Sequence, residues 1–197
     1  MMKRVGEGEG WRLQQLEQQF LQAFPPVVDP DSRVLILGSM PSVTSLRQGQ
    51  YYAHPHNAFW RIIHDLWGAF LPVDYAARTQ FLLAHELALW DVVAACRRNG
   101  SADATIRDAV ANDFAAFFRQ WPRIDRICFN GQMAEKLFMQ KVLKEQGFSA
   151  LEELRPGLLA CRLPSTSPAH AVSYASKLAS WKVVWQWVEE ETNEGCW

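Results

Sequence analysis

Cysteine is scarce in this chain of 197 residues, which contains only Cys96, Cys128, Cys161 and Cys196. No pair of them has the spacing of metal ligands, and nothing indicates a disulfide framework. Cys128 and Cys161 stand in apolar runs, where cysteine behaves as a small buried hydrophobe. We therefore expect a protein of a reducing, cytoplasmic compartment.

The chain also lacks an excess of charge of either sign, and it lacks long apolar runs. Its formal net charge is −1, so any binding of nucleic acid must rely on a local patch, helix N-termini and backbone amides. No apolar run approaches the roughly 20 residues that span a bilayer. The polar N-terminal residues have no apolar core of a signal peptide, so we expect neither a signal peptide nor a membrane partner.

Two nucleotide-binding motifs are absent as well. The sequence contains no G-x-G-x-x-G and no phosphate-binding P-loop. This argues against a nucleotide-binding α/β protein without a role on DNA.

Four short apolar runs bounded by polar or turn residues predict buried parallel strands. They are residues 33–37, 87–94, 124–129 and 158–163. Segments with helical spacing of apolar residues alternate with them. These segments are residues 11–24, 58–66, 75–85, 106–121, 132–146 and 172–191.

Strand, loop and helix thus alternate four times, which predicts an α/β fold. We expect a single three-layer αβα sandwich with a central, mainly parallel four-stranded sheet. Residues 1–10, rich in glycine and charge, are expected to be disordered, and residues 11–197 to form one domain. Ligands of such sheets bind beyond the carboxyl ends of the strands. The candidate site segments are therefore residues 38–57, Asp91 onward, Asn130-Gly131 and residues 164–168.

The first of these segments is unusual because it contains no carboxylate. It reads G-S-M-P-S-V-T-S-L-R-Q-G-Q-Y-Y-A-H-P-H-N-A-F-W, from Gly38 to Trp60. Its two histidines, His54 and His56, form a pair that a metal can use, but we find no third ligand and expect no metal.

Two motifs of the chain resemble the signature motifs of the uracil-DNA glycosylase superfamily. They are G-S-M-P-S…Q-Y-Y-A-H-P-H-N-A-F-W and L-P-S-T-S-P-A-H, and within the superfamily they are most similar to the hypoxanthine-DNA (deoxyinosine) glycosylase group. The first motif also resembles, in length, the loop of mismatch-specific uracil/thymine glycosylases, which begins G-I-N-P and ends N-x-F-W. The resemblance spans roughly residues 33–187.

This resemblance implies a base-excision repair enzyme. Such an enzyme flips a deaminated base, here hypoxanthine, out of DNA and hydrolyses its N-glycosidic bond to leave an abasic site. No lysine stands within the motifs for Schiff-base lyase chemistry, so we expect no strand cleavage. The cysteine spacing does not fit the iron–sulfur cluster of some superfamily branches. We expect a monomer without cofactor.

One departure from the family pattern concerns the catalytic residue. Met40 stands where the mismatch-specific enzymes have their catalytic asparagine, and a thioether is too weak an acceptor to position water. The resemblance to the deoxyinosine group implies that Asn57 takes over this role. Because the sugar passes through an oxocarbenium-like state, a neutral amide suffices to orient the water. Position alone favours a second role for Asn57 as a helix cap, and the two roles are compatible.

The resemblance also implies a base pocket. Gly38, Ser39 and Met40 would contribute backbone groups, which stabilise a leaving base as its charge develops. Tyr52 would stack on the flipped base, although one of the two adjacent tyrosines is expected to cover the sheet edge instead.

Two further side chains are candidates for the edge of the base. Asp91 would accept the N1–H of hypoxanthine, or else serve as a helix cap or pair with Arg97 or Arg98. Asn130 would contact a base edge, or else only form a tight Asn-Gly turn.

The remaining candidates are expected to grip DNA through hydroxyl and backbone N–H groups. They are Ser42, Pro164, Ser165, Thr166, Ser167, Pro168 and His170. An alternative is that Ser167 caps the final helix with Pro168 at its first position. His170 would contact phosphate or the leaving base, unless its place at a helix start is incidental.

Two other functions remain open at this point. One is a uracil or mismatch-uracil glycosylase, because the N3–H of uracil is a donor similar to the N1–H of hypoxanthine. The other is a lesion-binding module that has lost catalysis, which Met40 motivates.

Overall fold

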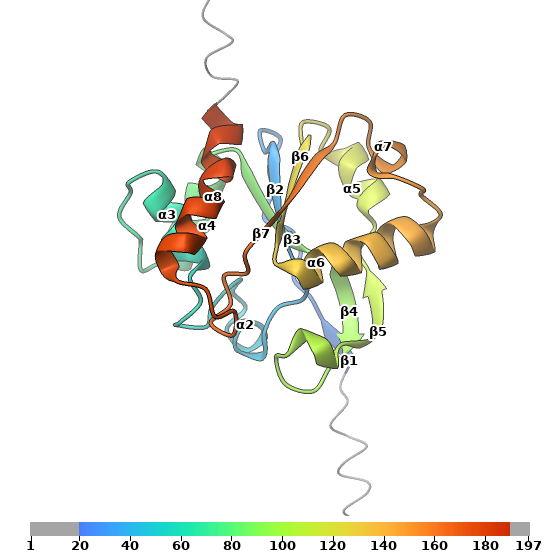
Figure 1. Cartoon of the computed structure of the whole chain (residues 1–197), viewed down its shortest axis with the longest axis horizontal. Helices are drawn as coiled ribbons and strands as arrows, with labels where there is room; N and C mark the ends of the chain where they lie inside the picture. Colours follow the sequence, from blue (N-terminus) through green and yellow to red (C-terminus); the bar gives the residue numbers. More distant parts are fainter. Residues whose placement is uncertain (1–19, 190–197) are drawn as a thin grey trace, which may run out of the picture.

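The computed structural model describes residues 20–189, and a central parallel sheet with helices on both sides dominates its architecture (Figure 1). The expected disorder of residues 1–10 and most of the helix expected over residues 11–24 lie outside the described residues.

The central sheet consists of four parallel strands in the order β3-β2-β6-β7. They are β2 (Val34–Gly38), β3 (Leu87–Asp91), β6 (Arg126–Asn130) and β7 (Leu159–Leu163). The predicted αβα sandwich with a four-stranded parallel sheet is therefore confirmed. Because Gly38 pairs with Asp91 and Asn130 with Leu163, the carboxyl ends of all four strands meet at one edge of the sheet.

A second, antiparallel sheet of three strands was not expected. It has the order β1-β4-β5, formed by β1 (Phe20–Gln22), β4 (Val93–Arg97) and β5 (Arg107–Ala111). The strand predicted over residues 87–94 is in fact two strands. The chain turns at Val92, whose N–H donates to the carbonyl of Gly38 over 2.9 Å, and continues in the other sheet.

Two helix predictions were wrong for the same reason. Phe20–Gln22 and Arg107–Ala111 pair on either side of β4, so pairing with a distant strand overrides their local pattern. The helix predicted over residues 106–121 begins only at α5 (Phe114–Gln120), where the Asp113 carboxylate accepts the N–H of Ala116 over 2.8 Å.

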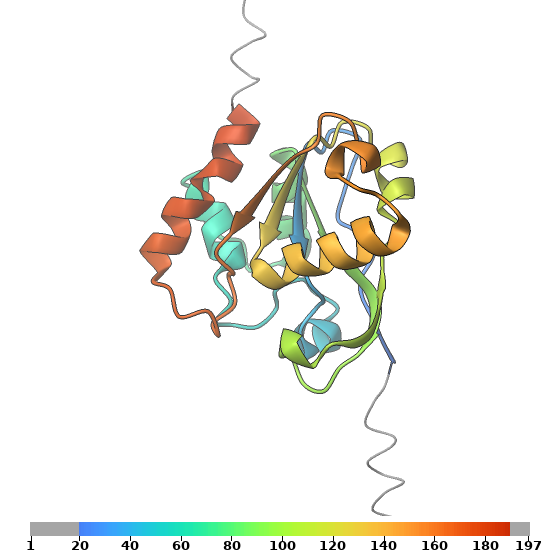
Figure 2. The same cartoon turned by 45° about the vertical axis from the view of Figure 1, so that its right-hand side comes forward.

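The other helices surround the central sheet (Figure 2). They are α2 (Val43–Gln48), α3 (Phe59–Leu66), α4 (Tyr75–Ala84), the 3-10 turn η1 (Asp103–Thr105), α6 (Gln132–Leu137) with its π-helical continuation η2 (Phe138–Lys144), α7 (Leu151–Leu154) and α8 (Tyr174–Glu189). Among the described residues, none of these helices has the length and apolar character needed to cross a membrane.

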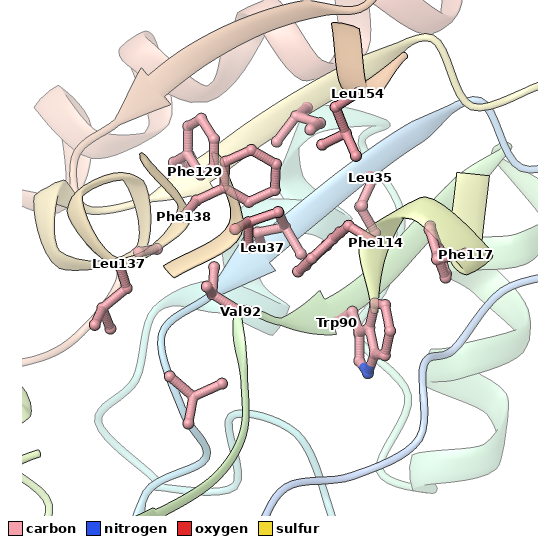
Figure 3. Packing of buried hydrophobic residues seen from close by; sticks show 14 of the residues in the cluster. Leu35, Leu37, Trp90, Val92, Phe114, Phe117, Phe129, Leu137, Phe138 and Leu154 are labelled. Atoms are coloured by element: carbon pink, nitrogen blue, oxygen red, sulfur yellow. The ribbon is translucent and has the colours of Figure 1, made fainter. Parts of the chain in front are cut away.

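Side chains of β2 alternate between two hydrophobic clusters, one on each face of the sheet. Leu35 and Leu37 pack against Phe114, Phe129 and Phe138 on one face (Figure 3). The opposite face packs against α3 and α8. Its fully buried side chains include Val34, Ile36, Phe59, Ile62 and Trp181. All five residues of β2 are buried, so the strand that leads into the predicted site is fixed from both sides.

Candidate active site

A pocket opens at the carboxyl ends of the central strands. Its lining comes from segments far apart in the sequence: Gly38, Ser39, Met40, Pro41, Ser42, Ser45, Tyr51, Tyr52, Asn57, Asp91, Ser101, Asp103, Asn130, Ser165, Thr166 and Ser167. The structure thus brings the predicted site residues together here, except Pro164, Pro168 and His170.

Asp91 is the most deeply placed charged group of this pocket. Its residue is only 3% exposed, and its Oδ2 has no hydrogen-bond partner among the described residues. No salt bridge joins Asp91 to Arg97 or Arg98 there, so the ion-pair alternative was wrong. Burial, and next the Asp103 carboxylate, raise the pKa of Asp91 to about 8, while Arg98 acts in the opposite direction.

Gly38 makes the position of Asp91 possible. A Cβ at Gly38 would lie 2.3 Å from Oδ1 of Asp91 and 3.0 Å from the hydroxyl of Tyr52. Any larger residue would therefore displace both groups. Because Gly38 has no side chain, the Asp91 carboxyl and the Tyr52 hydroxyl can both occupy the space at the end of β2.

Tyr52 adopts a strained backbone conformation beside this carboxyl. Its φ is 53°, in the left-handed region that non-glycine residues rarely occupy. One face of its ring stacks on Phe59 with centroids 4.0 Å apart. Its hydroxyl is buried without a hydrogen-bond partner of good geometry in the described part of the chain, although the nearby Asn130 amide opposes the rise in its pKa that burial and Asp91 cause.

Tyr51, in contrast, is a core residue. It is 3% exposed, its ring meets Phe24 edge-on, and its hydroxyl donates to the carbonyl of Pro25 over 3.2 Å. Its own carbonyl accepts the indole N–H of Trp60 over 2.8 Å. Tyr51 is therefore fixed in the core and anchors the strained residue that follows it.

Asn57 stands at the start of α3 and lines the pocket. Its Oδ1 accepts the N–H of Phe59 over 3.0 Å, so the side chain caps the helix as the alternative prediction stated. One lone pair of Oδ1 and the Nδ2 hydrogens are not used by this bond. The next N–H, of Ala58, donates to the carbonyl of Thr166 over 3.0 Å and ties Asn57 to the second motif.

Asn130 binds that second motif from the end of β6. Its Nδ2 donates to Oγ1 of Thr166 over 2.9 Å, and its Oδ1 accepts the N–H of the same residue over 2.9 Å. Residue 131 is a glycine with φ of 100°, as the predicted Asn-Gly turn requires. The Asn130 amide therefore positions the loop, and a contact between Asn130 and a base stays a prediction.

Helix α8 holds the same loop from the other side. The indole N–H of Trp181 donates to the carbonyl of Pro164 over 3.0 Å, and Nζ of Lys177 donates to that of Ser167 over 2.9 Å. Sequence reasoning missed both residues, because a tryptophan and a lysine in an amphipathic helix give no signal of a loop contact.

The serines of the site mainly form local hydrogen bonds. Ser42 caps α2 by accepting the N–H of Ser45 over 3.1 Å. Ser167 accepts the N–H of Ala169 over 3.2 Å. The expectation that Ser167 caps the final helix was wrong, because α8 begins later, and Ser173 accepts the N–H of Ser176 over 3.1 Å at that point.

A loop that the sequence did not assign to the site forms one wall of the pocket. Oδ1 of Asp103 accepts the hydroxyl of Ser39 over 2.8 Å, and Oγ of Ser101 accepts the N–H of Val43 over 3.0 Å. The loop was missed because residues 87–94 read as one strand. The chain leaves the central sheet at Val92 and continues in β4, and the loop between the antiparallel strands β4 and β5 brings residues 101–103 to the pocket.

Met40 forms an apolar wall between the pocket and the core. It is 6% exposed and packs within the cluster that contains Leu37 and Val92. The expectation that Met40 does not position water stays a prediction.

A larger groove adjoins the pocket and shares Tyr52 and Asn57 with it. Its histidine, arginine and lysine lining residues are His54, His56, Arg61, Arg78, His170 and Lys177. Pro168 lines the groove as well, while Pro164 and His170 line a shallow depression beside Gly131. A locally basic surface therefore leads to the pocket, although the net charge of the chain is −1. Within residues 20–189, no cluster of three or more potential ligands can hold a metal.

The raised pKa of Asp91 predicts a pH-dependent stability. The folded protein keeps a proton on Asp91 that the unfolded chain releases above the ordinary aspartate pKa of 3.8. The contribution of this proton to the free energy of unfolding is therefore full below pH 3.8 and is lost as the pH rises through about 8. Between about pH 5 and 7, we expect the free energy of unfolding to fall by about 1.4 kcal/mol per pH unit relative to Asp91→Asn. Urea denaturation measures this, with the exposed Asp31→Asn as control. A constant difference between wild type and Asp91→Asn would contradict the raised pKa.

Comparison with known proteins identifies the family to which this chain belongs. The model of the uracil DNA glycosylase superfamily matches residues 25–189. A protein of Methanosarcina acetivorans named hypoxanthine DNA glycosylase is 32% identical over 166 residues, 84% of this chain and 98% of that protein. A protein of the same name from Methanosarcina barkeri is 36% identical over 128 residues, 64% of this chain and 80% of that protein.

A solved structure supports the same assignment. The solution NMR structure of a Methanosarcina acetivorans protein assigned to the uracil DNA glycosylases superimposes with a TM-score of 0.70 and 32% identity. The match covers 87% of this chain and 99% of that one. The chain therefore belongs to the uracil DNA glycosylase superfamily.

Proposed function

We propose that this protein is a monofunctional DNA glycosylase that removes a deaminated base, with hypoxanthine as its main substrate, and leaves an abasic site. The observation that carries the proposal is the pocket in which a buried carboxyl, a strained tyrosine and an asparagine meet beside a basic groove. The names of the two relatives support hypoxanthine as the base. The proposal includes a monomer in the cytoplasm that needs no metal or cofactor.

Asp91 is placed to recognise the edge of a flipped base. Hypoxanthine presents an N1–H donor beside an O6 acceptor. With its pKa near 8, the Asp91 carboxyl is mostly protonated at neutral pH, so it can accept the N1–H and donate to O6. Its unpartnered Oδ2 then gains the partner that the free protein does not supply. Uracil presents the same donor and acceptor, so this contact does not exclude uracil.

Tyr52 supplies the stacking surface in this proposal. Phe59 supports one face of its ring, so a base on the other face would extend an existing stack. The strained backbone costs about 1–3 kcal/mol at such positions and persists because the surrounding contacts, such as the stack on Phe59, hold the ring in place before the substrate arrives. Ordering the ring in advance lowers the entropy lost when the base enters.

Asn57 orients the attacking water in the proposed mechanism. The glycosidic bond breaks through an oxocarbenium-like sugar, and the free lone pair of Oδ1 accepts a hydrogen bond from water at the junction of pocket and groove. Backbone N–H groups of residues 38–42, other than Pro41, stabilise the leaving base as it gains charge. The hydroxyl of the water bonds to the sugar carbon, and its released proton ends on the departed base. The carboxylates among the lining residues are Asp91 and Asp103, and neither belongs to the first motif.

The basic groove receives the DNA backbone. Arg61 on α3 and Arg78 on α4 line it together with His170 of the second motif. Guanidinium groups bind phosphate oxygens. The pocket that adjoins the groove then receives the nucleotide that is flipped out of the duplex.

A panel of labelled duplexes with inosine, uracil, xanthine or adenine at one position tests the substrate. We expect alkali-sensitive sites to form fastest at inosine. Faster release of uracil would assign the protein to the alternative uracil-specific function. Tight binding of inosine DNA without base release would favour a lesion-binding module instead.

Two substitutions separate the catalytic role of Asn57 from its capping role. Asn57→Ala removes both and should cost about 1 kcal/mol of stability and about 100-fold or more in single-turnover base release. Asn57→Ser keeps an acceptor for the Phe59 N–H but does not reach the water. It should keep the stability and lose the activity. Activity close to wild type in the serine variant would show that Asn57 is only a cap.

The groove predicts the salt dependence of DNA binding. Arg61→Gln and Arg78→Gln should each make the negative slope of log K against log salt concentration less steep by about 0.9 for duplex DNA, because each phosphate contact releases counterions. Fluorescence anisotropy measures this slope. Arg119→Gln, an exposed arginine on α5 across the sheet, is the matched control. Equal slopes in all three variants would refute the groove as the DNA-binding surface.

A further inference from the structure

Two cysteines that the proposed mechanism does not use lie side by side in the central sheet. Cys128 on β6 and Cys161 on β7 are directly opposite each other in the register of these parallel strands. They are 33 residues apart in the sequence, and their Sγ atoms are 3.6 Å apart. Both belong to the same hydrophobic cluster, so their side chains lie on the same face of the sheet. The fold therefore forms a dithiol that the spacing of the cysteines does not report.

The spacing of the two strands permits a bond between these sulfurs. Neighbouring strands lie about 4.7–4.9 Å apart, and disulfides join Cα atoms that are about 4.4–6.8 Å apart. The strand spacing is shorter than the roughly 5.5–6 Å that disulfides most often span, so a bond here would be strained. Strained disulfides are reduced more easily than structural ones. The pair thus suits a bond that forms and breaks, rather than a permanent cross-link.

The two thiols differ in their access to solvent. Cys128 is fully buried on an inner strand, whereas Cys161 is partly exposed on β7, the last strand of the central sheet. A hydrogen bond from Cys128 lowers the pKa of the Cys161 thiol, while burial raises the pKa of Cys128. The thiolate is the reactive form of cysteine. A small oxidant therefore meets Cys161 first, and Cys128 is the thiol beside it.

We propose that Cys128 and Cys161 are a modification site, at which a hydroperoxide converts the two thiols of the folded protein into a reversible disulfide. The proposal does not depend on the proposed function. No third potential ligand joins the pair within residues 20–189, so the two sulfurs are not part of a metal site there.

The reaction has two steps when the oxidant is hydrogen peroxide. The Cys161 sulfur attacks one peroxide oxygen, the O–O bond breaks, and the leaving hydroxide takes up the thiol proton, which gives a sulfenic acid and water. The Cys128 sulfur then attacks the sulfenic sulfur. An S–S bond forms, the S–O bond breaks, and the hydroxide leaves as water with the proton of Cys128. The two thiols are oxidised, and the peroxide is reduced to two molecules of water.

The other two cysteines provide matched controls. Cys96 on β4 is also fully buried, but it belongs to the hydrophobic cluster on the opposite face of the sheet. Cys196 lies outside the described residues. Cleavage after arginine and lysine places each of the four cysteines in a different peptide, so that every possible link has its own mass.

Peptide mapping of the full-length chain tests the proposal. The reduced, folded protein is treated with hydrogen peroxide, its free thiols are alkylated, and it is digested with trypsin without reduction. We expect an intact mass lower by about 2 Da and a main cross-link between the peptides of Cys128 and Cys161. Excess reduced glutathione, added to the folded protein before alkylation, should restore both thiols. The Cys96→Ser and Cys196→Ser variants should form the same link at the rate of the wild type.

Two alanine variants assign the order of attack. In Cys128→Ala, the sulfenic acid of Cys161 has no neighbouring thiol, so we expect dimedone to label Cys161 more than in the wild type. In Cys161→Ala, the buried Cys128 should stay unlabelled and unlinked.

Several results would overturn the proposal. These are a native chain in which peroxide leaves both thiols free, a link that forms only in urea, and a main link that involves Cys96 or Cys196. A bond that excess glutathione does not reduce in the folded protein would overturn its reversibility. If an alanine variant does not fold, the map of the wild-type chain still decides whether the disulfide forms.

Discussion

The burial of the Asp91 carboxyl against Gly38 is the constraint on which the site depends. The register of β2 and β3 places these two residues side by side, and a Cβ at Gly38 would lie 2.3 Å from the carboxyl. Among residues 20–189, none donates a hydrogen bond to Oδ2 of Asp91, so the ionised group destabilises the folded state at alkaline pH. A buried polar atom without a partner is costly for stability, and its position on a pocket floor indicates that a ligand satisfies it.

Hydrogen bonds fix the second-motif loop, which lines the same pocket as the Asp91 carboxyl. Carbonyls of the second-motif loop accept hydrogen bonds from two separate elements, through Ala58 at the start of α3 and through Lys177 and Trp181 of α8. The amide of Asn130 binds Thr166 twice. A flipped nucleotide must meet a water, a stacking ring and a base-edge contact at once, and an error of about 1 Å in any of them is costly to the rate. This requirement explains why so many hydrogen bonds fix loops that carry few charged groups.

The sequence predicted the parts of the site that local signals specify. Buried β-branched runs predicted the central strands, and the two motifs located Asn57, Tyr52 and the 164–168 loop. The contacts of Arg98 with Pro41 and of Asp103 with Ser39 were not predictable, because they depend on the chain leaving the central sheet at Val92. That turn arises from pairing with β1 and β5, which no local periodicity reports. The protonation of Asp91 was equally hidden, since it depends on burial by distant residues.

The lack of carboxylates in the Gly38 to Trp60 segment has a physical reason in this arrangement. This segment and the adjoining groove face the phosphodiester backbone in the proposed complex, where a carboxylate would repel the substrate. The acid that the pocket uses comes instead from the end of β3, below the surface, and burial keeps it mostly uncharged at neutral pH. A neutral acid offers a base both a donor and an acceptor without opposing a polyanion. A chain with almost no net charge can thus present a basic groove and still line the adjoining pocket with two carboxyl groups.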